Sequence, residues 1–410
     1  MGGRAVSKPL LLLADGDRRT LATRLEQAWR DGCTTAITTP QEAALLAAAL
    51  PAEVDPAWGA AVVLGTGGSS GGRRWCLQPL AHLQLAVDAT AHWLREIHLD
   101  PARLELFNPL PLQHVSGLMP LLRARRWGAV LHWLSPEQMR QPECLPPAQG
   151  EAVISLVPIQ LQRLLESQAG QRWLADFSVI WVGGAALPAA LAQQCRRLGL
   201  RLAPCYGSTE TGAMVAALAP HQFLAGTAGC GHPMPHAQLR LDSSSGALQI
   251  KAPSLGLGCL QAGQLQPLPL HQGWWSSGDR ARLTADGWHL EGRLDGAIQS
   301  GAETVFPDQV EQRLLALSRS VSLPLAELLL LPEPDPLWGE RLVALVKPAA
   351  VGADAAQDLL AALAALALEL PPSQRPRRWL LCPALERTAL GKWERGRWRG
   401  WLVSQAAATP

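Results

Sequence analysis

The sequence predicts an α/β protein with a large multi-sheet amino-terminal domain, a β-rich subdomain within it, and a small mobile α+β carboxy-terminal domain. The first observation is that short β-branched runs alternate with helical stretches, which is typical of parallel sheets covered by helices. The runs lie at residues 61–64, 153–156 and 179–182, and the helical stretches at residues 78–97, 158–169 and 187–198.

A change of texture at about residue 226 is the second observation. Short Gly- and Pro-rich segments such as GTAGCGHPMPH begin there and predict the β-rich subdomain. The third observation is a restart of the pattern after residue 292. A helix opens at Pro307, and strands follow at residues 327–331 and 342–346, as in a compact α+β unit.

Length and composition limit the class of protein. The 410 residues exceed one domain of roughly 150 residues, and we expect a large domain over residues 1–294 and a small one over residues 295–410. Hydrophobic residues make up 48% and charged residues 17%, which excludes an intrinsically disordered protein. The 36 basic and 34 acidic residues leave a net charge of +2 (36 − 34), which argues against a nucleic-acid-binding surface.

Membrane insertion and a disulfide framework are both disfavoured. The longest apolar stretch, residues 359–368, is about half of the roughly 20 residues that cross a bilayer. The eight cysteines are scattered with no CxxC pair, which favours buried or unreactive thiols over a metal site. We expect a cytoplasmic protein, and the sequence leaves a homo-oligomer open.

A glycine-rich segment after the first buried run has the residue types of a phosphate cradle. Glycines let backbone N–H groups approach an anion, hydroxyls add donors, and arginines add charge. The candidate ligands are Thr66, Gly67, Gly68, Ser69, Ser70, Gly71 and Arg74. The segment is not a Walker loop, because Arg73 and Arg74 replace the required Lys and Ser or Thr. A flexible connector is the alternative for this segment taken alone.

The segment YGSTETG, residues 206–212, has the residue types of a Mg-nucleotide corner. Tyr206 offers a ring for stacking a base, Ser208 and Thr209 offer hydroxyls, and Glu210 offers a carboxylate for a hard cation. The alternative is a polar turn with a solvated glutamate.

Two later residues could serve the same ligand. Asp279 follows a glycine in a predicted tight turn, where its carboxylate could accept both hydroxyls of a ribose. Lys392 follows Gly391 in a loop rich in Arg and Trp. The alternatives are a turn-capping aspartate and a solvated lysine.

In order and content these four segments, with residues 292–307, resemble the acyl-adenylating superfamily. This family includes acyl- and aryl-CoA synthetases, firefly luciferase and peptide-synthetase adenylation domains. The resemblance covers the chain from about residue 64 to residue 395. It implies that the segment from Thr66 to Arg74 binds triphosphate, that Tyr206 to Thr209 contact adenine and the α-phosphate, and that Glu210 holds Mg²⁺.

The resemblance also implies roles for residues elsewhere in the chain. Asp279 and Arg293 contact the ribose, and Asp295 is the hinge between the domains. Lys392 is the mobile lysine of adenylation. By the same resemblance, Ser300 and Gly301 line the coenzyme A tunnel. Gly183, Gly184 and Ala185 lie beside the adenine base.

The chain departs from the family pattern at four positions. Gly67 stands where a hydroxyl is usual and Arg73 where proline is usual. Arg74 replaces a lysine, which preserves the charge and changes its geometry. Glu386 replaces the proline before the final lysine. Triphosphate binding is the role that these departures affect most.

Two stretches narrow the substrate. Residues 109–118 and 154–161 look like the corresponding segments of o-succinylbenzoate–CoA ligases of menaquinone and phylloquinone biosynthesis. The implied substrate is an aromatic dicarboxylate, whose second carboxylate needs a cationic partner. Arg163 is our candidate for it, with a solvated helix arginine as the alternative. His114 and Ser208 are candidates near the reacting carboxylate, with a histidine satisfied by backbone as the alternative.

We therefore expect an ATP-dependent carboxylate–CoA ligase, closest to the o-succinylbenzoate–CoA ligases, that forms an acyl-adenylate and then a thioester with coenzyme A. Its expected catalytic residues are His114, Thr209, Glu210 and Lys392. The alternatives are another aryl- or acyl-CoA ligase or a carrier-protein-loading adenylation enzyme. A non-catalytic nucleotide-binding protein is the alternative from a different class.

Overall fold

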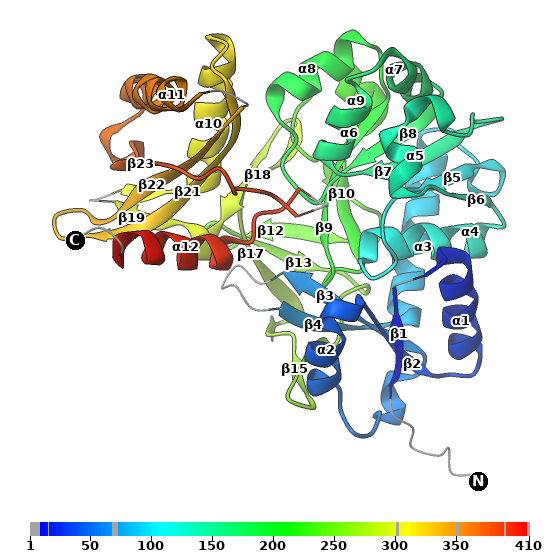
Figure 1. Cartoon of the computed structure of the whole chain (residues 1–410). Helices are drawn as coiled ribbons and strands as arrows, with labels where there is room; N and C mark the ends of the chain where they lie inside the picture. The colour runs from blue at the N-terminus through cyan, green and yellow to red at the C-terminus, as the bar shows by residue number, and fades with distance from the viewer. Residues whose placement is uncertain are drawn as a thin grey trace.

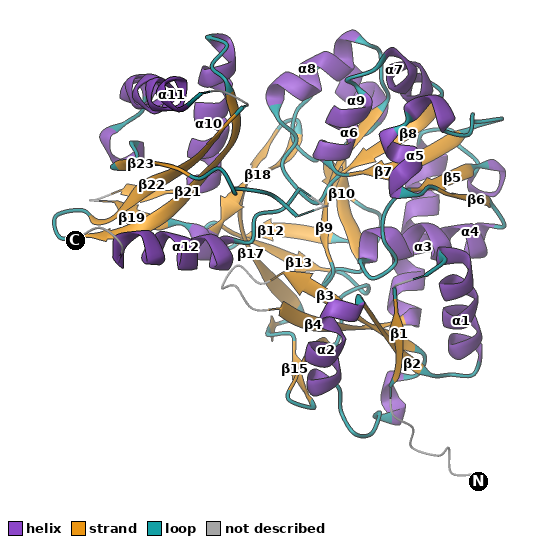
Figure 2. Ribbon diagram, viewed as in Figure 1, coloured by secondary structure: helices purple, strands orange, loops and turns teal. Residues whose placement is uncertain are grey.

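The computed structural model describes residues 9–14, 16–67, 73–300, 303–349, 352–388 and 391–407. Five of the predicted site residues therefore lie outside the described part of the chain: Gly68, Ser69, Ser70, Gly71 and Gly301. The described elements form four sheets with helices packed between and around them, as Figures 1 and 2 show. The predicted α/β class is confirmed.

The first sheet has six strands in the order β1-β2-β3-β4-β14-β15. β1 to β3 are parallel, and β3 and β4 form an antiparallel hairpin. The strands are β1 (Leu10–Leu13), β2 (Thr34–Thr38), β3 (Ala61–Gly67), β4 (Arg73–Pro79), β14 (Gly258–Gln261) and β15 (Gln264–Pro267). Helices α1 (Arg18–Arg30) and α2 (Ala43–Ala49) join its first strands.

The second sheet has seven strands in the order β11-β10-β9-β8-β7-β5-β6, and β5 to β9 are parallel. The strands are β5 (Glu105–Asn108), β6 (Val130–Trp133), β7 (Ala152–Leu156), β8 (Phe177–Val182), β9 (Leu202–Ser208), β10 (Ala213–Ala217) and β11 (His232–Pro233). Its helices are α3 (Leu80–Glu96), α4 (Val115–Trp127), α5 (Pro136–Arg140), α6 (Pro158–Leu164), α7 (Gln168–Ala175), α8 (Ala189–Arg197) and α9 (Pro220–Leu224).

Side-chain alternation along the central strands assigns the two faces of this sheet. Ile180 and Val182 of β8 pack on α6 to α9, whereas Val179 and Trp181 pack on α3. The opposite side of α3, with Leu83 and neighbours, packs with α4 on β1 to β3 of the first sheet. Helices α3 and α4 therefore lie between the two sheets, and burial of both of their sides fixes the sheets relative to each other.

The third sheet is antiparallel and corresponds to the predicted β-rich subdomain. It contains β12 (Gln238–Leu241), β13 (Ala247–Lys251), β16 (Leu270–His271), β17 (Trp274–Thr284) and β18 (Gly287–Arg293). Its core includes Trp275 and Trp288 with Val215 of β10, so it packs against the edge of the second sheet.

The fourth sheet, in the order β20-β19-β22-β21 with β23 beside β22, forms the carboxy-terminal unit. Its elements are β19 (Ile298–Ser300), β20 (Glu303–Val305), α10 (Pro307–Ser320), β21 (Leu325–Asp335), β22 (Gly339–Pro348), α11 (Ala353–Leu366), β23 (Arg378–Leu381) and α12 (Arg395–Ala407). Figure 1 shows this unit to one side of the other three sheets, with the chain after β23 extending towards β10 and α6 before it returns to α12. The boundary at residues 294 and 295 stays a prediction.

One predicted helix is wrong in extent. Residues 158–169 contain the whole of α6 and only the start of a second helix, because α6 ends at Leu164 and α7 begins at Gln168. Ser167 caps α7 by accepting a hydrogen bond from Gly170 N at 3.0 Å, and Leu164 and Leu165 on one side and Trp173 on the other enter the same core. The cap and the change of direction explain the break.

Candidate active site

The two ends of the predicted phosphate-binding segment are strands. β3 continues to Gly67 and β4 begins at Arg73, with Thr66 opposite Arg74 in the antiparallel register. Residues 68–72 between them lie outside the described part of the chain. Backbone pairing between the strands places the Thr66 and Arg74 side chains beside each other at the end of the hairpin.

Side chains from both β3 and β4 contact Glu210. The Thr66 hydroxyl donates to Glu210 Oε1 at 3.5 Å, and an Arg74 guanidinium nitrogen lies 3.5 Å from the same oxygen. The Glu210 side chain is only 6% exposed, so the alternative of a solvated glutamate in a polar turn is wrong. Both contacts are long, and within the described part of the chain they leave most of the carboxylate's acceptor capacity for a further partner.

The turn that carries Glu210 is held by its own backbone geometry. β9 and β10 are antiparallel, and a Cβ at Gly207 would lie 1.9 Å from the Ala213 carbonyl oxygen, so only glycine fits there. Ser208 N donates to the Thr211 hydroxyl at 2.8 Å. The Ser208 Oγ is buried and has no hydrogen-bond partner among the described residues. An orphaned hydroxyl at this position is a ready donor or acceptor for a ligand.

Tyr206 and Asp279 form the other end of the site. The Tyr206 hydroxyl donates to Asp279 Oδ2 at 2.5 Å, and Arg293 Nη1 lies 3.6 Å from Asp279 Oδ1. Burial, together with the Asp279 charge, raises the pKa of Tyr206 well above its usual value, so the phenol stays a donor. Asp279 lies within β17 opposite Arg293 of β18, not on the predicted turn. Gly278, the residue before Asp279, has a left-handed φ of +75° within the strand.

The predicted adenine-side glycines lie next to the strand that carries Tyr206. They follow the end of β8, and a Cβ at Gly183 would lie 2.9 Å from the Cys205 sulfur. Gly184 has a φ of +79°, and both Gly184 and Ala185 are exposed. Gly183 and Gly184 thus add no side chain to the surface beside Cys205.

The loop of Lys392 reaches the large unit. Gly391 lies so close to Ile159 of α6 that a Cβ there would be 3.0 Å from Ile159 Cγ2. The loop closes on itself, because Thr388 N donates to the Lys392 carbonyl oxygen at 2.9 Å and Lys392 N donates to Thr388 Oγ1 at 3.1 Å. Lys392 is exposed, and Figure 1 shows its segment extending away from the fourth sheet.

Arg163 and His114, the candidates for the substrate carboxylates, lie on different elements. Arg163 is exposed on α6 and lies four residues after Ile159, on the helix face that the Lys392 loop contacts. His114 is half-buried at the N-cap of α4, where its carbonyl oxygen accepts from Gly117 N and Leu118 N, both at 3.0 Å. These backbone bonds satisfy the carbonyl group of His114 and leave the role of its ring as a prediction.

The predicted hinge and tunnel residues lie at the junction of the two units. Asp295 is in a single 3₁₀ turn, Leu294–Gly296, between β18 and β19. Ser300 is fully buried at the end of β19, and its Oγ has no hydrogen-bond partner in the described part of the chain. No part of Ser300 faces solvent in this arrangement, so its role beside coenzyme A remains a prediction.

Sequence reasoning missed several residues that support the site. Gln78 donates from Nε2 to the Thr209 carbonyl oxygen. Ser254 donates to the Thr211 carbonyl oxygen at 2.7 Å, and His236 Nε2 lies 3.0 Å from the Ser254 hydroxyl. Strand alternation from Arg74 could have indicated Gln78, four residues along β4 on the same face. No local pattern indicates the other two.

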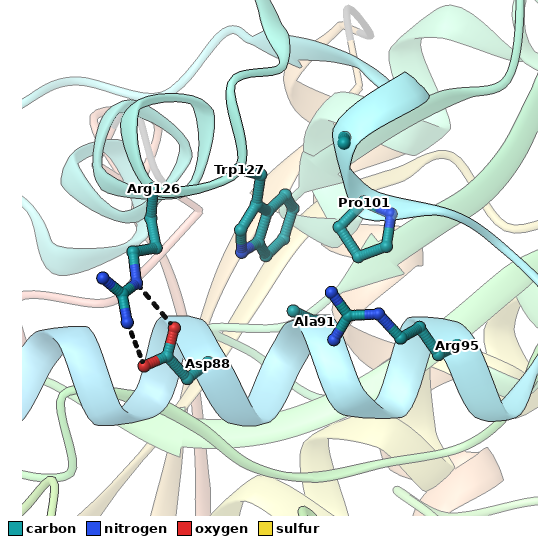
Figure 3. Close-up of a pocket in the computed structure, with 7 residues that line it drawn as sticks. Asp88, Ala91, Arg95, Pro101, Arg126 and Trp127 are labelled. Carbon is teal, nitrogen blue, oxygen red and sulfur yellow. Dashed lines mark hydrogen bonds and ion pairs between the residues drawn. The ribbon is translucent and has the colours of Figure 1, made fainter.

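A separate hollow lies away from this site. A hollow of about 370 Å³ between α3, α4 and the segment at Pro101 is lined by Asp88, Ala91, Arg95, Pro101, Ala102, Arg126 and Trp127. Figure 3 shows Arg126 paired with Asp88 at one end of this hollow and Arg95 at the other. None of these residues belongs to the site built around Glu210 and Asp279.

No helix of the described residues is long and apolar enough to span a membrane.

The sequence profile of the family described as "AMP-binding enzyme" matches residues 10–254. This is more than half of the chain, and the chain therefore belongs to the AMP-binding enzyme family, as the resemblance predicted.

Individual relatives narrow the comparison. The 2-succinylbenzoate–CoA ligase of Escherichia coli is 29% identical over 292 residues, which cover 69% of this chain and 59% of the relative. The indoleacetate–CoA ligase of Aromatoleum aromaticum is 28% identical over 324 residues, which cover 72% of this chain and 59% of that relative. The chain thus spans about three-fifths of the length of these relatives.

A solved structure extends the likeness to the whole fold. An Escherichia coli MenE variant with bound OSB-AMS superposes with a TM-score of 0.72, at 24% identity, over 98% of this chain and 88% of that one. At this identity the superposition supports the fold of both units.

Proposed function

We propose that the protein is an ATP-dependent carboxylate–CoA ligase that acts on an aromatic dicarboxylate of the o-succinylbenzoate type. One observation carries this proposal. Within the β9–β10 hairpin, Tyr206 contacts Asp279, and Glu210, four residues later in the turn, contacts Arg74. A candidate ribose-binding acid and a candidate phosphate-binding cation held by neighbouring residues of one hairpin match the two ends of a nucleotide.

The residues around Glu210 fit a bound Mg²⁺. The described residues contain no group of three or more His, Cys, Asp or Glu side chains able to hold a metal ion. Mg²⁺ commonly takes one or two protein carboxylates and completes its shell with phosphate oxygens and water, so a single buried carboxylate suffices. Bound there, Mg²⁺ would neutralise phosphate charge.

Lys392 and Arg74 supply the protein's own positive charge for the first half-reaction. The substrate carboxylate attacks the α-phosphorus in line, forming an acyl-adenylate and releasing pyrophosphate. The Lys392 ammonium stabilises the charge that develops at the α-phosphate, and it acts electrostatically, not as a base. Arg74 and Thr66 orient the departing phosphates from the β3–β4 hairpin, and the Ser208 and Thr209 hydroxyls contact the α-phosphate.

A rotation about Asp295 separates the two half-reactions. After adenylation the small domain, residues 295–410, turns, withdraws Lys392 and presents the coenzyme A tunnel beside Ser300 and Gly301. The coenzyme A thiol then attacks the acyl carbonyl carbon, and AMP leaves. The close approach of Gly391 to Ile159 is what we expect of the adenylation orientation.

Arg163 is the candidate for the second carboxylate. It shares a face of α6 with Ile159, so its guanidinium lies on the side of the helix that the Lys392 loop covers. A charge-assisted pair there would select a dicarboxylate over a monocarboxylate. His114 would border the reacting carboxylate.

The direct test is detection of the product. The full-length protein is incubated with ATP, Mg²⁺, coenzyme A and o-succinylbenzoate, and mass spectrometry measures o-succinylbenzoyl-CoA and AMP. We expect both in equal amounts. Pyrophosphate release with other aryl acids but none with o-succinylbenzoate would leave a different aryl-CoA ligase, which the indoleacetate–CoA ligase relative makes the second candidate. Nucleotide binding without pyrophosphate release from any acid would contradict both.

A further inference from the structure

One face of β4 supports the Glu210 turn through alternating residues. Arg74, Cys76 and Gln78 are two residues apart, so their side chains point to the same side of the strand. Arg74 contacts the Glu210 carboxylate and Gln78 contacts the Thr209 carbonyl oxygen. Cys76 therefore lies between the two side chains that hold the turn.

A second cysteine faces Cys76 from the neighbouring strand. Cys259 of β14 is directly opposite Cys76 in the antiparallel register, with Leu260 opposite Trp75 on one side of the pair. Directly opposed residues have Cα atoms about 4.5 to 5.5 Å apart. A disulfide needs about 4.4 to 6.8 Å, so the backbone already has the spacing that this bond requires.

The two thiols differ in a way that suits thiol exchange. Cys76 is fully buried, whereas Cys259 is partly exposed. The interaction between the two thiols lowers the pKa of Cys259 and raises that of Cys76. The accessible sulfur is thus the better nucleophile, and the buried one is placed to resolve the mixed disulfide.

The pair is coupled to the phosphate end of the site. The Glu210 carboxylate and the Arg74 guanidinium both act electrostatically on Cys76 and Cys259. Gly256 makes the link by contact: its N–H donates to the Glu210 carbonyl oxygen at 2.8 Å, and a Cβ on it would lie 3.0 Å from the Cys76 sulfur.

We propose that Cys76 and Cys259 form a redox-active dithiol beneath the nucleotide site, which low-molecular-weight disulfides such as glutathione disulfide oxidise to a cross-strand disulfide. The Cys259 thiolate attacks one glutathione sulfur, and a mixed disulfide forms as one glutathione thiolate leaves. The Cys76 thiol loses its proton and attacks the Cys259 sulfur, expelling the second glutathione. Two protein thiols are oxidised, one disulfide is reduced to two thiols, and the two protons pass to the glutathiones.

Oxidation changes the support of Glu210. Oxidation joins the two sulfurs by a covalent bond of about 2.0 Å, which fixes the Cys76 side chain between Arg74 and Gln78. We expect weaker binding of ATP and Mg²⁺, a consequence that rests on the proposed function, whereas formation of the disulfide does not.

The first test is chemical. The native protein is equilibrated with reduced and oxidised glutathione over a range of ratios, alkylated, digested and mapped by mass spectrometry. We expect a peptide pair linked through Cys76 and Cys259, lost on reduction, with Cys259→Ser abolishing it. Cys144→Ser, which removes an exposed cysteine from another region, is the matched control and should leave the link unchanged. Alkylation of both thiols at every ratio would overturn the proposal, as would linkage of either to a different cysteine.

The second test is functional, and it uses the wild-type protein as its own reference. Isothermal titration measures ATP–Mg²⁺ affinity before oxidation, after oxidation and after re-reduction. We expect oxidation to weaken binding about fivefold or more, reversibly, with no such change in Cys259→Ser. Equal affinities for linked and reduced protein would overturn the coupling to Glu210. Failure of the reduced protein to release pyrophosphate would instead count against the proposed function and leave the disulfide intact.

Discussion

The Tyr206 hydroxyl donates a 2.5 Å hydrogen bond to Asp279 across 73 positions of the chain. It ties β9 of the second sheet to β17 of the third, and Glu210 follows Tyr206 by four residues. The two carboxylates expected at opposite ends of a nucleotide are thereby attached to one hairpin. A site of this kind forms only where the sheets meet, which is why its residues are dispersed in the sequence.

Asp279→Asn should weaken nucleotide binding about tenfold or more, because charge-assisted hydrogen bonds to ribose hydroxyls become neutral ones. Tyr206→Phe should weaken nucleotide binding less, since it removes only the hydrogen-bond partner of the Asp279 carboxylate. Isothermal titration with ATP and Mg²⁺ measures both, and Asp286→Asn, at an exposed turn of the same sheet, serves as the control. Full affinity in Asp279→Asn would argue against ribose binding there.

Lys392→Ala should reduce acid-dependent pyrophosphate release by about a hundredfold or more, the usual effect of removing one electrostatic donor at a transition state. Conversion of a supplied acyl-adenylate to the thioester should be spared. Lys251→Ala, which removes an exposed lysine on β13, should alter neither rate. Equal loss of both half-reactions in Lys392→Ala would be inconsistent with the assigned role.

Asp295→Pro should give the reverse pattern. Proline fixes φ in the single turn between β18 and β19, so the small domain should be hindered in leaving the adenylation orientation. Pyrophosphate release should persist while thioester formation from a supplied acyl-adenylate falls. A variant that forms the thioester at the wild-type rate would show that the chain turns elsewhere.

Arg163→Ala should raise the KM for o-succinylbenzoate about tenfold or more, through loss of a charge-assisted pair, and leave the KM for a benzoate without the second carboxylate unchanged. Steady-state pyrophosphate release measures both. Arg172→Ala removes an exposed arginine on α7 and is the control. An equal rise for both acids would indicate that Arg163 acts on something common to them.

The half-buried His236 gives the fold a pH dependence. Burial lowers its pKa from 6.5 to about 4, so the unfolded chain takes up a proton first as the pH falls. The contribution of His236 to the free energy of unfolding is therefore complete above about pH 6.5, and it is lost as the pH falls from about 6.5 to about 4. Burial raises the pKa of Glu311 from 4.5 to about 7, so the folded state takes up this proton first as the pH falls. Glu311 therefore stabilises the fold as the pH falls, in a pH range that overlaps that of His236.

Urea unfolding of the wild type and of His236→Asn between pH 4 and pH 8 separates the two groups. The difference in the free energy of unfolding between the two proteins should shrink as the pH falls, because only the wild type loses the neutral-histidine advantage. A constant difference across this range would show that His236 does not titrate as its burial implies.

The sequence predicted the elements better than their contacts. Hydrophobic patterns placed β3, β7, β8 and α3 to within a few residues, and Pro307 marked the start of α10. The motifs also indicated Tyr206, Glu210 and Asp279. By contrast, Cys76 meets Cys259 and Gln78 meets Thr209 only because β4 pairs with β14 beside the second sheet. Such partners depend on sheet order, which no local pattern encodes.

The position of bound nucleotide tests the central claim most directly. A crystal structure of the protein with ATP and Mg²⁺ should show the ribose hydroxyls on Asp279, the adenine beside Tyr206 and Gly184, and the phosphates between Thr66, Arg74 and Glu210. Nucleotide in the hollow between α3 and α4, or a nucleotide that contacts only one of Asp279 and Glu210, would contradict it.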